Sequence, residues 1–184
     1  GKESLALDIG CPATGPLVTK LLARADVFLD SALPGTLAEL GLDYPSLASN
    51  EGLIHASLTD FGQDGPWRDY VMNDAAHLAL GGQMASSGYS DPKETPIGGQ
   101  GRHAWHMGCA FVLHGITVAL FDRMGSGLGQ YIDVSIHDAC AAGTEAAVPQ
   151  WMYYGSTMYR HTGMHANPKR LPPLQLPTAD GKYI

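Results

Sequence analysis

The first half of the chain alternates short apolar runs with helical patterns. Residues 5–9, 27–29 and 53–58 have the length and composition of buried strands, whereas 16–24 and 36–40 carry apolar residues at helical spacing. Strands that alternate with helices at such separations are typical of βαβ units, in which crossover helices cover the faces of a parallel sheet. The pattern therefore predicts an α/β fold with a parallel sheet and flanking helices.

The second half is mainly helical. Asn73 is placed to cap a helix, and the Gly-, Ser- and Pro-rich stretch 86–101 predicts a loop. A long helix is expected over about 104–123, and because it is apolar on most faces we expect it to be buried. A strand at 131–135 and an Ala-rich helix at 136–148 follow.

A change in composition predicts a domain boundary near residue 150. Beyond Pro149 the chain becomes aromatic, basic and proline-rich, and 179–182 has hairpin-turn chemistry. We therefore assign 1–150 to a large domain and 151–184 to a linker and the start of a smaller α+β domain. The chain begins on a strand-like pattern without Met and stops where another strand begins, so we interpret it as an interior fragment.

Composition excludes several classes of function. The chain has 184 residues, 45% of them hydrophobic and 16% charged, as expected of a globular domain. A net charge of -7 argues against a nucleic-acid partner, which needs clustered Lys and Arg. No apolar run of about 18 residues is expected to span a membrane. Three widely spaced cysteines without a CxxC pair indicate a reducing, cytoplasmic setting.

Five short motifs follow one another in the order found in one enzyme family. The chain resembles family III of the CoA-transferases, the CaiB/BaiF group that includes formyl-CoA transferase, carnitine CoA-transferase and α-methylacyl-CoA racemase. The matching segments are S-L-A-L-D at 4–8, P-G-T-L with L-G-L-D-Y at 34–44, F-G-Q-D-G-P at 61–66, G-L-G-Q-Y-I-D-V-S at 127–135 and T-A-D-G-K-Y at 178–183.

The resemblance implies a fold, substrates and a partner. It implies a Rossmann-like large domain, incomplete here, that leads into a small domain, and an interlocked homodimer. It also implies coenzyme A esters and free carboxylic acids as substrates, with no metal. In the family an aspartate attacks the thioester to give a mixed anhydride, and the released CoA thiolate then gives an aspartyl-CoA thioester that the acceptor acid resolves.

The nucleophilic aspartate of that family is missing from this chain. Its position, at the start of the long helix, corresponds to Ala104 or Trp105, depending on which later glycine is used for the count. No Asp or Glu lies between Glu94 and Asp122, so a small shift of the alignment does not supply one.

Three interpretations of this loss stay open. In the first, His103 or His106 supplies the chemistry as base or nucleophile, because imidazole titrates near neutrality. In the second, the chain is a non-catalytic half of a tandem protein. In the third, it binds CoA esters without turnover. Asp74 matches the acid of the racemases' His-Asp pair, while Asn73 replaces the His. Asp74 with His106 would be the acid–base pair of a racemase or isomerase. Asp74 is also explained as a charge that favours a helix N-terminus.

Further positions are assigned to CoA by the resemblance. Leu7, Asp30 and Ser31 match segments that contact the cofactor, although the polar Asn, the aromatic residue and the Arg of the family's E-N-F-R-P-G are absent. The run Gly98, Gly99 and Gln100 matches the loop beside the acyl site, where backbone amides approach an oxygen; its alternative is a plain connector.

Two other signals have a structural alternative. His103 and His106 form HxxH, but no Cys, Asp or Glu cluster completes a zinc site, so no metal is expected. An aromatic and basic stretch at 151–165 lines the acyl pocket or the adenine site, or forms the buried crossing of the interlocked dimer, the interpretation we favour.

Overall fold

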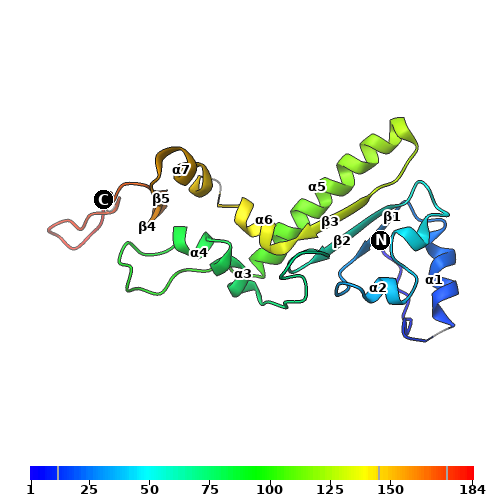
Figure 1. Ribbon diagram of the computed structural model, residues 1–184. Helices are drawn as coiled ribbons and strands as arrows, with labels where there is room; N and C mark the ends of the chain where they lie inside the picture. The colour runs from blue at the N-terminus through cyan, green and yellow to red at the C-terminus, as the bar shows by residue number, and fades with distance from the viewer. Residues whose placement is uncertain (12, 145, 173) are drawn as a thin grey trace. The chain divides into compact units, whose positions relative to one another are not determined.

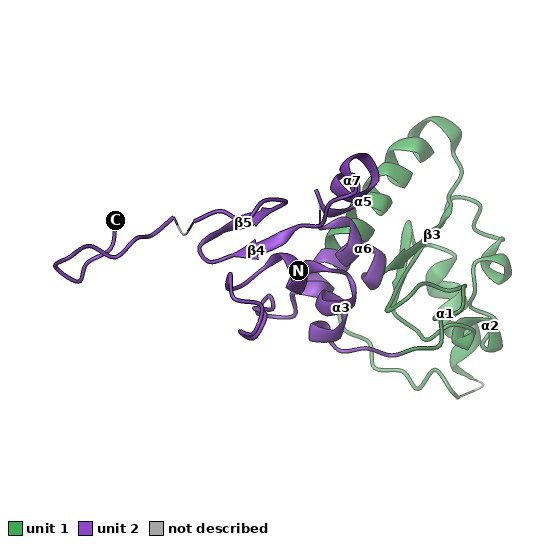
Figure 2. Ribbon diagram, turned by 60° about the vertical axis from the view of Figure 1, so that its left-hand side comes forward, with its two compact units in different colours: residues 1–70, 109–135 green, residues 71–108, 136–184 purple. Residues whose placement is uncertain are grey.

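The computed structural model describes residues 1–11, 13–144, 146–172 and 174–184 (Figure 1). The described chain separates into two compact units (Figure 2). Residues 1–70 and 109–135 form the first unit, and residues 71–108 and 136–184 form the second. The long helix α5 (His103–Ser126) gives its first turns to the second unit and the rest to the first.

The first unit is built on a three-stranded sheet with all strands parallel. Strands β1 (Val27–Asp30), β2 (Ile54–Thr59) and β3 (Tyr131–Ser135) lie in the order β1-β2-β3, with Asp30 opposite Ser57 and His55 opposite Tyr131. Strand β2 lies in the centre, and all six of its residues are buried. The predicted α/β fold with a parallel sheet is confirmed.

Helix α1 (Thr14–Leu22) precedes β1 in the chain. Helix α2 (Thr36–Glu39) and the 3-10 turn η1 (Pro45–Leu47) lie between β1 and β2. A buried leucine cluster joins them to the sheet: Leu22, Leu42, Leu47 and Leu53. The predicted strand at 5–9 is wrong. Leu5 and Ile9 are exposed and the segment forms no ladder with another described strand, which a strand requires for its backbone groups.

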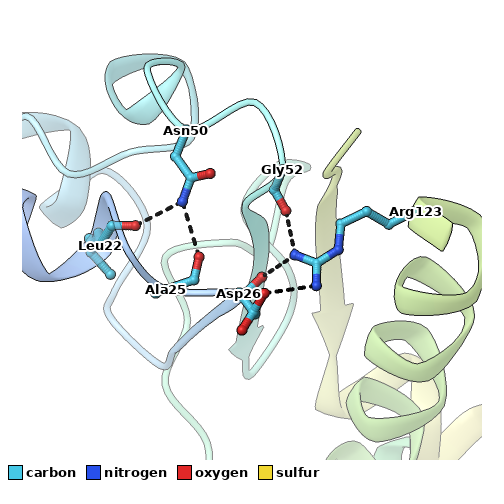
Figure 3. Close-up of polar contacts among 6 residues, drawn as sticks. All are labelled: Leu22, Ala25, Asp26, Asn50, Gly52 and Arg123. Atoms are coloured by element: carbon cyan, nitrogen blue, oxygen red, sulfur yellow. Dashed lines mark hydrogen bonds and ion pairs between the residues drawn. The ribbon is translucent and has the colours of Figure 1, made fainter. Parts of the chain in front are cut away.

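Polar contacts close the end of the sheet where β1 and β2 begin (Figure 3). Asn50 donates from Nδ2 to the carbonyl oxygens of Leu22 and Ala25, each at 3.0 Å. Arg123 of α5 donates from Nη1 to the Gly52 carbonyl at 2.8 Å and from Nη2 to Asp26 Oδ1 at 2.9 Å. Together these bonds hold α5 and the η1–β2 loop to the same edge.

Gly129 explains why the glycine turn before β3 is needed. A Cβ on Gly129 would overlap the carbonyl group of Leu53, so only glycine fits. Its amide donates to the Glu51 carbonyl at 2.7 Å. The turn therefore lets β3 enter the sheet directly beside β2.

The described part of the second unit contains helices, one small hairpin and an isolated antiparallel bridge between Pro177 and Tyr183. Its helices are α3 (Asp74–Leu80), α4 (Gln83–Ser86), the start of α5, α6 (Ile136–Ala142) and α7 (Ala147–Tyr154). The single helix predicted over 136–148 is wrong: Gly143 lies between α6 and α7, and residue 145 lies outside the described residues. Strands β4 (Tyr159–His161) and β5 (Met164–Asn167) pair antiparallel.

Helix α5 is less buried than its sequence predicts. Ala104, Val112 and Ala119 are buried, but Phe121 is 78% exposed and Met124 is 84% exposed. By length and composition alone α5 could cross a membrane, in contrast to the sequence expectation, although a single such helix is weak evidence for a membrane span. In this structure Arg123 holds α5 to the first unit's sheet.

Candidate active site at the start of the long helix

Asp74 binds the first turn of α5. Its Oδ1 accepts from the backbone amide of Ala104 at 2.9 Å and from that of Trp105 at 3.4 Å. Asp74 is itself the first residue of α3, whose N-terminus Asn73 caps by accepting from the Ala76 amide at 2.9 Å, as predicted. The carboxylate thus satisfies amides that a helix N-terminus leaves without partners, and its negative charge is favoured there.

The glycine loop lies directly against His103. A Cβ on Gly99 would lie 2.6 Å from His103 Cβ and 2.7 Å from its Cγ, and a Cβ on Gly98 would lie 2.7 Å from Met84 Cε. The Gly99 contacts are closer than real Cβ atoms make, so the loop approaches the imidazole only because residue 99 has no side chain, whereas the flexible Met84 side chain could move away from Gly98. The loop therefore has a specific packing role in addition to its flexibility.

A cavity of about 570 Å³ opens beside this loop, within the second unit. Its volume lies within the range typical of small-molecule sites. Both apolar and polar side chains line it, and His103 and the loop form part of its wall. Its lining includes Met84, Gly98, Gly99, His103 and His165.

The structure distributes the sequence-predicted residues unequally around this cavity. Gly98, Gly99 and His103 line it, whereas Gln100 and His106 are exposed and do not. His165 also lines it and was only a member of an aromatic and basic stretch in the sequence. The two candidate positions for a nucleophile differ as well: Ala104 is fully buried, and Trp105 is half-buried.

Gln83 of α4, which lines the cavity, joins α4 to α5 and α6. Gln83 donates from Nε2 to Met107 Sδ at 2.9 Å and to the Cys140 carbonyl at 3.4 Å. Cys140 is buried, and burial together with the nearby Asp74 carboxylate raises the pKa of its thiol to about 11. The thiol is therefore neutral near pH 7 and acts as a packing residue.

Asp30, assigned to CoA by resemblance, belongs to a hydrogen-bonded network in the first unit. Its Oδ2 lies 2.8 Å from His55 Nε2 and 2.6 Å from Ser57 Oγ, and its Oδ1 accepts from the Ala32 amide at 2.9 Å. Tyr131 donates to Ser57 Oγ at 3.1 Å. Burial raises the pKa of Asp30, but the hydrogen bonds from His55, Ser57 and Ala32 outweigh it, and the net pKa is lowered.

This network lies at a smaller cavity of about 190 Å³. Two buried atoms in its wall have no hydrogen-bond partner among the described residues: His55 Nδ1 and Asp43 Oδ1. The His55 ring stacks on Phe28 with a centroid distance of 4.5 Å and meets Tyr131 edge-on at 5.2 Å. The cavity thus offers an aromatic wall together with hydrogen-bonding atoms.

Sequence reasoning missed His55, Ser57, Asp43 and Tyr131. His55 and Ser57 were two polar residues, two apart, inside a buried strand, and that spacing places both side chains on one face of the sheet. Of the other predicted CoA positions, Leu7 lies in the segment without a strand, and Ser31 directly follows β1. Neither lines this cavity. Among the residues that the structure describes, no group of three or more His, Cys, Asp or Glu could hold a metal ion.

Comparisons with known proteins identify the family. The model of CoA-transferase family III matches residues 1–184. Succinyl-CoA–D-citramalate CoA-transferase of Chloroflexus aurantiacus is 35% identical over 100% of this chain and 45% of its own length. Subunit BbsE of the succinyl-CoA:(R)-benzylsuccinate CoA-transferase of Thauera aromatica is 33% identical over 100% of this chain and 43% of its own length.

The fold agrees with these matches. A crystal structure of a CaiB/BaiF family protein from Brucella suis has a TM-score of 0.82 and 29% identity, over 96% of this chain and 46% of that one. The chain thus spans about 45% of the length of the curated relatives named here. The match over the whole sequence, together with the shared parallel sheet, shows that the chain belongs to CoA-transferase family III.

Proposed function

We propose that the protein transfers CoA from an acyl-CoA thioester to a free carboxylic acid. The observation that carries this proposal is the cavity at the start of α5, lined by Gly98, Gly99 and His103. In the family the nucleophile stands at the start of this helix, so the cavity supplies space for an acyl group where the resemblance expects one. The printed activities of the relatives support the same general reaction.

In the proposed mechanism the His103 imidazole replaces the missing aspartate. A ring nitrogen attacks the thioester carbonyl, and the C–S bond breaks to release CoA thiolate and leave an acyl-imidazole. The acceptor carboxylate attacks this acyl group, and the imidazole departs as the mixed anhydride forms. The thiolate then attacks the acceptor's carbonyl, which yields the new CoA ester and the donor acid.

Asp74 acts in this proposal as a positioning residue. Its carboxylate binds the amides of Ala104 and Trp105, the two residues that follow His103 in the chain. It therefore fixes the helix turn that carries the imidazole. His106, one turn further along α5 and exposed, has no part in the proposed steps.

The smaller cavity beside Asp30 is assigned to part of the CoA molecule. Its unpartnered Asp43 Oδ1 accepts hydrogen bonds, and so does His55 Nδ1 when Nε2 carries the ring proton toward Asp30. The Tyr44 and Tyr131 rings in its wall suit a flat ligand. Asp30 already accepts from three donors, so in this proposal it holds the cavity wall in place, and Asp43 and His55 bind the ligand.

A second candidate function is supported by two observations. The chain has no acid between Glu94 and Asp122, and the similar protein BbsE is a subunit of a larger enzyme. In this alternative the chain binds a CoA ester without turnover, and another half or subunit supplies the aspartate. For either function we propose a homodimer or a pair of related subunits in the cytoplasm, and no metal.

The test is CoA exchange by the full-length protein. Succinyl-CoA would be offered with a panel of carboxylic acids, and new CoA esters would be measured for wild type, His103→Ala and the matched control His106→Ala. Exchange that is lost only in His103→Ala supports the imidazole mechanism. Absence of exchange in the wild type, with CoA esters still bound, supports the second candidate. Exchange that survives His103→Ala contradicts the proposed role of His103.

A further inference from the structure

We propose that a second cavity in the second unit is a binding site for a small oxyanion, a carboxylate or a phosphate, held by Arg160 and Arg170. This cavity has a volume of about 340 Å³, and Ser90, Tyr159 and His161 also line it. It is distinct from the cavity that His103 lines, although Met158 borders both. The inference goes beyond the proposed transfer and does not depend on it.

The guanidinium of Arg160 is already oriented by the protein. Its Nη2 donates to the backbone carbonyls of Glu94 at 2.8 Å, Pro92 at 3.1 Å and Asp91 at 3.4 Å. Its Nε and Nη1 form no hydrogen bond within the described residues. A guanidinium that is fixed in this way loses little further entropy when its free edge binds an oxyanion.

The loop at 90–94, which Arg160 contacts, also forms hydrogen bonds to the turn between β4 and β5. The Ser90 amide donates to Thr162 Oγ1 at 3.1 Å, and the Thr162 amide donates to Ser90 Oγ at 3.0 Å. The wall of the cavity is therefore held at both ends. Such a wall keeps its shape when no ligand is bound, which is how small-molecule sites are usually built.

Arg170 brings a second charge to the same cavity. Its guanidinium carbon lies 5.2 Å from the centroid of the Tyr159 ring, a cation–π distance. In the part of the chain that the structure describes, neither Arg170 nor Arg160 forms an ion pair. Stacking thus steadies Arg170 without neutralising its charge.

No carboxylate of the described residues forms an ion pair with Arg160 or Arg170. The chain has 11 Lys and Arg against 18 Asp and Glu, so two arginines at one cavity depart from the acidic balance of the protein. The acids nearby are Asp91 and Glu94, but Arg160 contacts only their backbone carbonyls. His161, also in the wall, turns its Nε2 to the Lys169 carbonyl at 3.1 Å.

An oxyanion matches these groups in charge and in geometry. Carboxylate and phosphate oxygens bind the parallel N–H groups of a guanidinium in pairs, with stronger bonds than neutral partners make. The two arginines fit the oxygens of a carboxylate and of a phosphate alike. A carboxylate probe and a phosphate probe distinguish them.

The test is calorimetric titration of the full-length protein with sodium succinate and, separately, with sodium phosphate. Ionic strength is kept constant with chloride, because nonspecific attraction depends on salt. We compare wild type with Arg170→Gln, and we use Arg68→Gln as a matched control, since Arg68 is an exposed arginine of the first unit. Tyr159→Leu removes the stacking partner as a second variant.

The expected result is saturable binding of one probe to the wild type. Binding should weaken about tenfold or more in Arg170→Gln, because a charge-assisted hydrogen bond is lost. It should weaken less in Tyr159→Leu and stay unchanged in Arg68→Gln. Binding of succinate assigns the site to a carboxylic acid, and binding of phosphate assigns it to a phosphate group. No saturable binding of either probe, or equal loss in Arg68→Gln, overturns the proposal. Because binding is measured directly, failure of CoA exchange leaves this result unaffected.

Discussion

In the first unit, the polar side chains on the sheet bind one another, whereas in the second unit those at the start of α5 face a cavity or bind backbone amides. Asp30 accepts from three donors, and His55 and Ser57 are buried with it. His103, by contrast, is exposed and lines a cavity of about 570 Å³. The difference separates groups whose bonding holds the fold from groups that are free to react.

Both regions contain a carboxylate that the family resemblance marks as functional. In the structure, each of these carboxylates forms hydrogen bonds that join two elements of the fold. Asp30 ties β1 to β2, and Asp74 ties α3 to α5. We therefore expect substitutions at these acids to affect stability before chemistry. A substitution at His103 should affect chemistry before stability.

The largest expected effect is that of His103→Ala on CoA exchange. Loss of the imidazole removes the proposed nucleophile, so we predict a fall in kcat of at least about 100-fold. Because the side chain is exposed, the free energy of unfolding should change by less than about 0.5 kcal/mol. Steady-state kinetics and urea denaturation measure the two quantities. A variant that keeps kcat and loses stability would reverse the assignment of the two regions.

The next largest effect is that of Asp30→Ala on stability. The substitution leaves His55 and Ser57 buried without their acceptor, so we predict a loss of about 3 kcal/mol in the free energy of unfolding. Ser57→Ala, which removes one donor, should cost about 1 kcal/mol. Chemical denaturation compares the two variants. An Asp30→Ala protein of wild-type stability would show that the network does not hold the sheet.

Acid should weaken the same network. The pKa of Asp30 is lowered in the folded protein from an ordinary value of 3.8, so its carboxylate adds stability above that value. This contribution is lost as the pH falls through the lower folded pKa. Below pH 4 the wild type should therefore lose stability more steeply than Asp30→Asn, as followed by thermal unfolding at successive pH values. Parallel curves would contradict the assigned direction of the shift.

A smaller effect is expected at Asp74. Asp74→Ala removes the acceptor for the α5 amides and should cost about 1 kcal/mol, the usual cost of a lost helix cap. Asp74→Asn keeps an acceptor oxygen, so it should retain most of both stability and CoA exchange. If Asp74→Asn is stable but inactive, the carboxylate acts as an acid or base and our positioning role for it is wrong.

The smallest effect concerns cysteine reactivity. Cys11 and Cys109 are exposed, whereas Cys140 is buried with a thiol pKa of about 11. At pH 8 a thiol reagent should label the first two quickly, and Cys140 only when the second unit unfolds. Peptide mass mapping over time distinguishes the three. Rapid labelling of Cys140 would show that α3 and α6 do not shield it.

Local patterns predicted the elements that local chemistry determines. The strands near 27–29, 53–58 and 131–135 and the cap at Asn73 were predicted because apolar spacing and capping residues act over a few positions. The strand at 5–9 was wrong because an apolar run does not supply a partner strand. The β4–β5 hairpin was missed, since Tyr, Arg and His alternate there without an apolar stripe.

Contacts between distant residues set most of the site and could not be predicted. Asp74 reaches the Ala104 amide across 30 positions, and Arg160 reaches the 91–94 loop across 66 or more. The family resemblance indicated the glycine loop, and the chemistry of imidazole made both His103 and His106 candidates. Only the structure separates His103 in the cavity wall from His106 outside it. The His55 network follows from strand register, which the sequence pattern leaves open.

The most direct test of the account is a single-turnover reaction of the full-length protein with succinyl-CoA in the absence of an acceptor acid. Free CoA would be separated from succinyl-CoA by chromatography, because a thiol reagent would also react with the exposed Cys11 and Cys109. The protein would be followed by mass spectrometry. We predict a burst of CoA in proportion to the protein, with a succinyl adduct on His103 that is absent from His103→Ala and present in His106→Ala. An adduct elsewhere, or no burst from a protein that binds succinyl-CoA, would contradict the account.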